Sequence, residues 1–224
     1  HMWAETFDRS TNGASLFDTQ DDLVSRIVAT VGDGYGILVR SMATMLRDRP
    51  VEDLSIRELG LRYFVHFQTF HAEEHRRLCE AFEKALVVEP TDALGWSFLS
   101  CLYEQEGIQG LSFHPDAASR RRFTAERAID LDPSLQQAWR CLGVSSFLDH
   151  DLPGLRLAAE RAQELNPLNT STLAYLGMFL ALAGDWDRGV ATVRRCMDLN
   201  PLHPGWFQLA LIFNHFRKAE FDIL

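Results

Sequence analysis

The sequence predicts an all-α fold, a right-handed superhelix of antiparallel helix pairs. Four helix-like segments each end in Glu, Asp or Asn followed by proline, and the spacings between these prolines are 43, 34 and 34 residues. The prolines are Pro90, Pro133, Pro167 and Pro201. Large residues recur six positions after each proline, and small residues recur five positions before it. Self-similarity at a fixed period indicates a stacked repeat, in which each helix pair buries its apolar face against the next pair.

The residues that keep this phase are expected to pack the two helices of each pair together. A large residue on one helix must fit a small residue on the other where the helices cross closely. Each proline stops the second helix because it cannot donate the next backbone hydrogen bond. The expected packing residues are Ala85, Trp96, Ala128, Trp139, Leu142, Gly143, Ala162, Leu176, Gly177 and Trp186.

The repeat also predicts where each helix begins and ends. The expected pairs are 56–69 with 72–88, 92–106 with 116–131, 135–148 with 152–165, and 169–182 with 186–199, followed by the start of another pair at 203–216. The segment SIRE, from Ser55 to Glu58, has the pattern of a capping box that opens the first helix. In the turn GDWD, Gly184 ends one helix and Asp185 caps the next, so these acidic residues are interpreted as part of a turn.

The interval of 43 residues contains nine more residues than the others, assigned to GIQGLSFHP at 107–115. Its two glycines and its proline predict an irregular loop between the helices of the second pair. Because loops carry function more often than the elements they connect, this insertion is of functional interest.

Composition excludes several classes of function. The 224 residues carry 22 basic and 31 acidic side chains, a net charge of −9, which argues against binding of nucleic acid by this chain. No apolar run approaches the roughly 18–20 residues of a membrane span, so no membrane partner is expected. The N-terminus lacks the pattern of a signal peptide, and His1-Met2 resembles a cloning remnant. The four cysteines lie far apart and are interpreted as small buried core residues.

Residues 1–50 do not follow the repeat. The stretch 3–7 alternates like a short strand, and 16–32 has the pattern of an amphipathic helix. The segment WAETFDRSTNGASLFDTQDDLVSRIVATVGDGYGILVRS resembles the closing strand and helix of the TolB-like domain of bacterial multidomain regulators. We therefore expect two domains, a C-terminal remnant of a TolB-like domain at 1–50 and a tetratricopeptide repeat (TPR) domain at 51–224.

The remaining repeats resemble the TPR region of the same bacterial signalling proteins, which are of the adenylate cyclase or winged-helix regulator type. The stretches that carry this resemblance are RPVEDLSIRELGLRYFVHF (49–67), AGDWDRGV (183–190) and NPLHPGWFQLALIFNHFR (200–217). The resemblance implies a regulatory interaction region, separated from an output domain that this sequence does not contain. No position matches the cyclase or DNA-binding residues of the family. The expected location is cytoplasmic, or periplasmic if a membrane helix lies upstream.

In TPR arrays the first helices of successive pairs line a concave groove. Positions seven, eleven and fourteen after each proline give its expected lining, which is Ser97, Cys101, Glu104, Arg140, Val144, Phe147, Ala174, Met178, Ala181, Gln208, Ile212 and His215. This lining is mixed and largely apolar, and it lacks the repeated Lys and Asn set that clamps a terminal carboxylate. It fits an amphipathic helix or an extended apolar segment of a protein or peptide partner. The residues expected to bind that partner are Arg140, Val144, Phe147, Met178, Ile212 and His215.

Two alternatives stay open. The groove is also able to hold the chain's own N-terminal segment or a second copy of the chain, which would make a homodimer and an oligomerisation device. The segment from His71 to His75 has the form H-x-x-E-H, which on a helix is typical of a zinc hydrolase with two imidazole ligands and Glu74 as general base. However, it opens a second repeat helix, where polar residues face water, and no third ligand stands out. We therefore expect no metal, no cofactor and no catalysis.

Overall fold

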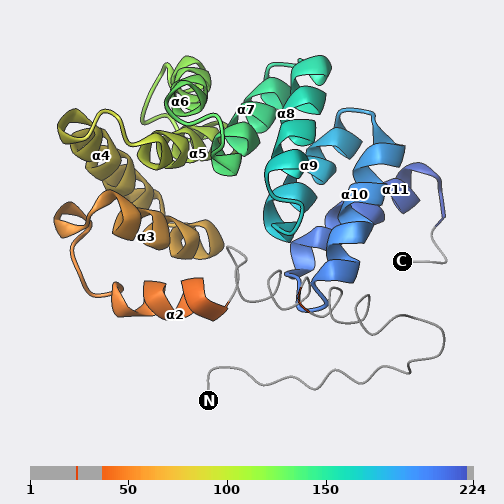
Figure 1. Cartoon of the computed structure of the whole chain (residues 1–224), viewed down its shortest axis with the longest axis horizontal. Helices are drawn as coiled ribbons and strands as arrows, with labels where there is room; N and C mark the ends of the chain where they lie inside the picture. The colour runs from red at the N-terminus through yellow and green to blue at the C-terminus, as the bar shows by residue number, and fades with distance from the viewer. Residues whose placement is uncertain (1–23, 25–36, 221–224) are drawn as a thin grey trace.

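The computed structural model describes residues 24 and 37–220, and every regular element in this part of the chain is helical. The elements follow one another along an arc that starts at α3 and ends at α11 (Figure 1). Their bounds are α2 Ile37–Met45, η1 Val51–Asp53, α3 Ile56–Thr69, α4 Ala72–Val88, α5 Ala93–Gln109, α6 Ala117–Leu131, α7 Gln136–Leu148, α8 Leu152–Leu165, α9 Thr170–Leu182, α10 Trp186–Leu199, η2 Gly205–Gln208 and α11 Leu209–Arg217. The fold is a right-handed superhelix of antiparallel helix pairs, as the sequence predicts.

The helix bounds agree closely with the predicted ones. The bounds of α3, α4, α8 and α10 coincide with the prediction at both ends. In the predicted pair at 203–216, the first turn is the 3-10 helix η2 and the α-helix starts at Leu209. The strand and the helix predicted at 3–7 and 16–32 lie outside the described residues. Helix α2, which the sequence did not predict, packs against α3.

The predicted insertion loop is shorter than expected. Helix α5 continues through Gly107 to Gln109, and it ends at Gly110, which has a left-handed backbone with φ of 67°. Glycine adopts this conformation without a steric penalty, and its backbone N–H bonds the carbonyl of Glu106. The loop therefore spans 110–116, and three residues of the predicted loop belong to the helix instead.

All four repeats end their second helix in the same way. The residue before each proline donates its backbone N–H to the carbonyl of the small residue five positions before that proline. The four pairs are Glu89 with Ala85, Asp132 with Ala128, Asn166 with Ala162, and Asn200 with Cys196. The proline that follows removes the next donor, so the helix stops at an equivalent place in each repeat.

The two repeat tryptophans also occupy equivalent places. The indole N–H of Trp96 donates to the carbonyl of Pro90, and that of Trp139 donates to the carbonyl of Pro133, each at 2.9 Å. Both rings are half-buried. Each tryptophan therefore ties the start of one helix pair to the proline that ended the pair before it.

Side chains cap three of the helices, but not the one expected at the GDWD turn. Asp92, Asp151 and Asn169 accept hydrogen bonds from the third backbone N–H of α5, α8 and α9. Asp185 stands at the N-cap position of α10, yet its carboxylate accepts from the guanidinium of Arg156 at 2.7 Å and caps no backbone group. The predicted capping box of α3 is present, with Glu58 accepting from the backbone of Ser55 at 2.9 Å.

The apolar core runs along the arc as two adjoining clusters. One extends from Leu46 to α6 and includes Cys141 of α7, and the other extends from α7 to α11. Leu142 is half-buried against the first cluster, and Trp186 is half-buried with the guanidinium of Arg217 4.7 Å from its ring centroid. None of the helices in the described part of the chain is long and apolar enough to cross a membrane.

Glycines allow close approaches both within the α9–α10 pair and between α7 and α9. A β-carbon at Gly143 would lie 2.6 Å from a methyl group of Leu176, and one at Gly177 would lie 3.0 Å from the carbonyl of Gly189. A β-carbon at Gly189 would meet the carbonyl of Gly177 at 2.4 Å and the backbone nitrogen of Ala181 at 2.5 Å. Helices α9 and α10 therefore touch through their backbones, which excludes any side chain at this crossing.

We predict that Gly189→Ala destabilises the protein by about 3 kcal/mol, because the added methyl group meets backbone atoms that cannot move independently. Gly205→Ala is the matched control, since a β-carbon at that position meets no atom within 4 Å. Urea unfolding followed by circular dichroism measures both variants. Equal stability of the two variants would show that the α9–α10 crossing is able to relax.

Candidate functional site

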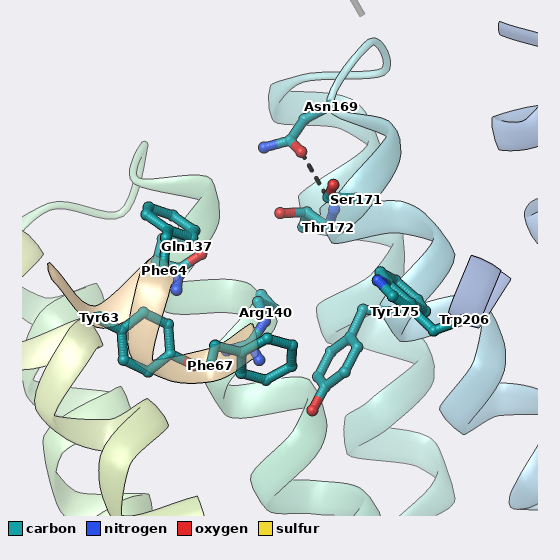
Figure 2. Close-up of a pocket in the computed structure, with 10 residues that line it drawn as sticks. All are labelled: Tyr63, Phe64, Phe67, Gln137, Arg140, Asn169, Ser171, Thr172, Tyr175 and Trp206. Carbon is teal, nitrogen blue, oxygen red and sulfur yellow. Dashed lines mark hydrogen bonds between the residues drawn. The ribbon is translucent and has the colours of Figure 1, made fainter. Parts of the chain in front are cut away.

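A cleft lies on the inner side of the arc, where helices from distant repeats meet. Helix α3 contributes three aromatic side chains, and the remaining ones come from α7, from α9 with its N-cap residue, and from η2 (Figure 2). Its lining residues are Tyr63, Phe64, Phe67, Gln137, Arg140, Asn169, Ser171, Thr172, Tyr175 and Trp206. The cavity volume is about 80 Å³. This is far below the roughly 300–1,000 Å³ of sites that enclose small molecules.

Aromatic rings from both ends of the arc form the walls of this cleft. The ring centroids of Phe67 on α3 and Tyr175 on α9 are 6.3 Å apart, and those of Tyr175 and Trp206 are 5.7 Å apart. Both pairs have edge-to-face geometry, which is a favourable arrangement for aromatic rings. The curvature of the superhelix therefore brings the first repeat into contact with the fourth.

A buried charged pair forms the base of the cleft. Arg140 is 7% exposed and Glu104 is 1% exposed, and their closest nitrogen and oxygen atoms are 3.4 Å apart. The hydroxyl of Tyr175 donates to the same carboxylate oxygen at 2.7 Å, and the guanidinium of Arg140 lies 4.4 Å from the centroid of the Tyr175 ring. Because each charge has its partner within the protein, this base is stable without a charged ligand.

The protonation states at the base follow from these contacts. Burial works against the charge of Arg140, but the Cys101 sulfur and the Glu104 carboxylate outweigh it and raise the pKa of the guanidinium well above its usual range. Burial, followed by the Glu104 carboxylate, raises the pKa of the Tyr175 hydroxyl well above its usual range. Arg140 therefore stays charged and Tyr175 stays protonated at physiological pH.

Two cysteines lie directly beneath Arg140. The sulfur atoms of Cys101 and Cys141 are 3.3 Å apart, and Arg140 donates to Cys101 at 2.8 Å. Burial raises the pKa of both thiols, but for Cys101 the hydrogen bond from Cys141 and the charge of Arg140 outweigh burial and lower the pKa. Neither side chain has more than 1% of its surface exposed, so a substrate cannot reach these sulfur atoms.

Only one of the six residues expected to bind a partner lines the cleft. Arg140 lies at its base, whereas Val144 is fully buried in the core. Phe147 and Met178 are half-buried against the second core cluster. Ile212 is exposed on α11, and the imidazole of His215 is 2.8 Å from the carboxylate of Glu220.

The other positions of the expected lining are mostly buried too. Ser97, Cys101, Glu104, Ala174 and Ala181 have almost no exposed surface, and Gln208 is exposed on η2. The inner surface is instead formed by positions four, seven and eight after the prolines, such as Gln137 and Tyr175. The predicted positions eleven and fourteen residues after the prolines therefore do not line this cleft, and their role in binding stays a prediction.

Sequence analysis missed the aromatic residues of α3. Tyr63 and Phe67 are four residues apart and therefore share one face of the helix, which is a detectable pattern in RYFVHF. That pattern alone is typical of a core-facing helix. These rings lie opposite α9 only because the superhelix is curved. That curvature is the accumulated rotation between successive repeats, which one helix does not reveal.

The residues of the H-x-x-E-H motif do not converge. His71 is exposed at the N-cap of α4, His75 is fully buried, and the Glu74 carboxylate pairs with Arg62 at 2.8 Å. Burial lowers the pKa of His75 to about 4, so its imidazole is neutral at physiological pH. This arrangement does not support the zinc hydrolase with ligands His71 and His75.

We predict that Arg140→Met costs about 3–5 kcal/mol in unfolding free energy, because it leaves the Glu104 carboxylate buried without a cation. The double variant Arg140→Met, Glu104→Gln removes both charges, and we expect it to recover most of this loss. Urea unfolding of the wild type and both variants measures the effect. Equal stability of the single and double variants would contradict a buried ion pair at the cleft base.

Comparison with solved structures shows which known fold this arrangement shares. The chain is similar to a thermophilic TPR protein from Thermus thermophilus, with a TM-score of 0.55 and 15% sequence identity over 86% of this chain and 98% of that one. No family model matches the sequence. No curated protein matches it either. The chain therefore has the TPR fold, with helix pairs stacked into a superhelix.

Proposed function

We propose that this chain is a non-catalytic protein-interaction module whose cleft binds an extended peptide segment with apolar or aromatic side chains. The observation that carries the proposal is the aromatic cleft, in which Phe67 of the first repeat and Tyr175 of the fourth repeat lie in edge-to-face contact. Half-buried aromatic residues are favourable anchors in binding surfaces, because they offer a large rigid contact area.

The size and polarity of the cleft support a peptide. A cavity of about 80 Å³ accepts one side chain at a time rather than a whole cofactor. The lining also carries the amides of Gln137 and Asn169 and the hydroxyl of Ser171, so it is polar as well as aromatic. The opposite charges of Arg140 and Glu104 at the bottom of the cleft cancel, so the cleft does not require a charged ligand.

We further propose that this module belongs to a bacterial signalling protein, and that occupancy of the cleft is relayed to an output domain elsewhere. This proposal is supported by the resemblance of residues 1–50 and of the repeats to regulators with a TolB-like domain. The same resemblance supports a cytoplasmic location, with the periplasm as the alternative.

A second candidate function is self-association, which the exposed apolar face of α11 favours. Leu209, Ile212, Phe213 and Phe216 all lie on α11 and are exposed in the described part of the chain, and Phe216 is the most exposed of them at 66%. Contiguous exposed apolar side chains at one end of an array are typical of a surface that binds another protein or another copy.

We predict that Ser171→Arg weakens the binding of a cleft peptide at least tenfold, because the long side chain fills the cavity. The probe is a peptide selected from a displayed random library on the wild-type protein, and its affinity is measured by fluorescence polarisation. Ser119→Arg is the matched control, since Ser119 is exposed on the outer helix α6. Equal affinity for both variants would remove the cleft from the proposal.

If α11 forms a contact between copies, Phe216→Asp is expected to convert a concentration-dependent dimer into a monomer. Light scattering across a range of protein concentrations measures this change. Val87→Asp is the matched control, because Val87 is an apolar residue on the distant helix α4 that is even more exposed than Phe216. A wild-type chain that stays monomeric at every concentration would exclude self-association.

A further inference from the structure

A second cluster of polar side chains lies where α4, α5 and the loop 110–116 meet. His75 and Cys79 are one turn apart on α4, and Glu106 is near the end of α5. All three side chains are fully buried. One nitrogen, one sulfur and one oxygen atom from these residues lie within 4.8 Å of one another.

One of these buried atoms lacks a hydrogen-bond partner. The Nε2 atom of His75 has no hydrogen-bond partner among the described residues, although the side chain has no exposed surface. It points at the carboxylate of Glu106, with 3.7 Å between the nitrogen and the oxygen. Buried polar atoms are almost always satisfied by a partner, so an unpaired nitrogen aimed into a polar cluster indicates a missing ligand.

The separations are somewhat longer than those of ligands that share one metal ion. The Cys79 sulfur is 3.9 Å from the same Glu106 oxygen that faces His75. Two ligands of a tetrahedral zinc ion with ordinary bond lengths lie about 3.4–3.6 Å apart. Small side-chain movements therefore bring all three atoms into the first coordination sphere of one ion.

We propose that His75 Nε2, Cys79 Sγ and the Glu106 carboxylate bind one divalent transition metal ion, zinc by the chemistry of the donors. An imidazole, a thiolate and a carboxylate are ligands that zinc accepts together, with a fourth position for water. The Cys79 thiol gives its proton to the solvent when the metal binds. The thiolate and the carboxylate then balance the two charges of the ion, which makes a buried site neutral overall.

Neighbouring side chains hold two of the ligands in place. His66 Nε2 lies 3.1 Å from His75 Nδ1, so the other ring nitrogen of His75 is free to face the metal. His114 Nδ1 lies 2.6 Å from Glu106 Oε1, the same oxygen that faces His75 and Cys79, and the backbone N–H of His114 donates to Oε2 at 3.0 Å. Metal ligands in proteins are typically oriented by outer partners of this kind.

The proposed metal site gives the insertion in the second repeat a structural role. His114 lies in the loop 110–116, and Phe113 of the same loop stacks on the His75 ring with a centroid distance of 6.2 Å. The metal would therefore anchor the loop to α4 and α5. Because the loop covers the three buried ligands, the role of the ion is structural rather than catalytic.

The test is titration of the metal-free protein with Co²⁺, followed by absorption spectroscopy. We expect one ion per chain, with a thiolate-to-cobalt charge-transfer band and visible bands of a tetrahedral site, and displacement by Zn²⁺. Cys79→Ser should remove the charge-transfer band, and Glu106→Gln should weaken the affinity at least 100-fold. His71→Ala is the matched control, because this exposed histidine beside the same helix should leave the spectrum unchanged.

His114→Gln tests the outer partner separately. We expect its affinity for Co²⁺ to fall 10- to 100-fold while the thiolate charge-transfer band persists, because the first-sphere ligands remain. A purely structural role of His114 would lower the unfolding temperature of the metal-free protein without changing the affinity.

Two results would overturn the proposal. One is the absence of stoichiometric binding to the folded wild-type chain, and the other is binding that survives Cys79→Ser but disappears in His71→Ala. Because buried variants sometimes fail to fold, the wild type also provides a measurement of its own. Equimolar Zn²⁺ should raise its unfolding temperature and a chelator should reverse the rise, and an unchanged temperature would also reject the site.

Discussion

The structure depends on the close crossing of the two helices within each pair. A pair of helices cannot bury its apolar face alone, so each pair must stack on the next. Gly177 and Gly189 allow the backbones of α9 and α10 to touch, and Gly143 gives the same space to Leu176. The repeated hydrogen bond that ends each second helix, such as Asp132 to Ala128, keeps successive pairs in phase. Because the pairs repeat the same geometry, small rotations between them add up to the curvature of the arc.

That curvature creates the cleft. No single repeat contains it, since Phe67 and Tyr175 are separated by more than one hundred residues and meet only after three helix pairs have turned the chain back. The base is fixed by Arg140 and Glu104, which lie on neighbouring repeats and hold α5 and α7 together. Under the proposed function, a partner would bind a surface that is already ordered when the chain has folded.

The sequence predicted the repeat and most helix bounds because these depend on local chemistry. Proline, the small residue five positions before it and the tryptophan six positions after it act within a few turns of helix.

The lining of the groove could not be predicted in the same way. Val144 and Tyr175 both lie on first helices of a pair, and only the packing of the whole array decides that Val144 is buried while Tyr175 lines the cleft. Gly107 was misjudged as a loop residue, since a helix tolerates one glycine when its neighbours pack. The H-x-x-E-H motif failed for a related reason, because His71 precedes the first turn of α4 and does not share a face with His75.

Two buried glutamates of α5 have different kinds of partner. Glu104 and Glu106 lie two residues apart on α5 and therefore point to different sides of the helix. Glu104 is satisfied by Arg140 and Tyr175, so its cluster is complete and serves as a rigid floor for binding. Among the described residues, Glu106 meets only histidines and a thiol, and neither Lys nor Arg forms an ion pair with it. A buried carboxylate without Lys or Arg beside it is a group that a metal ion is able to pair. The His75 nitrogen, 3.7 Å from this carboxylate and without a hydrogen bond among the described residues, offers a second ligand at the same place.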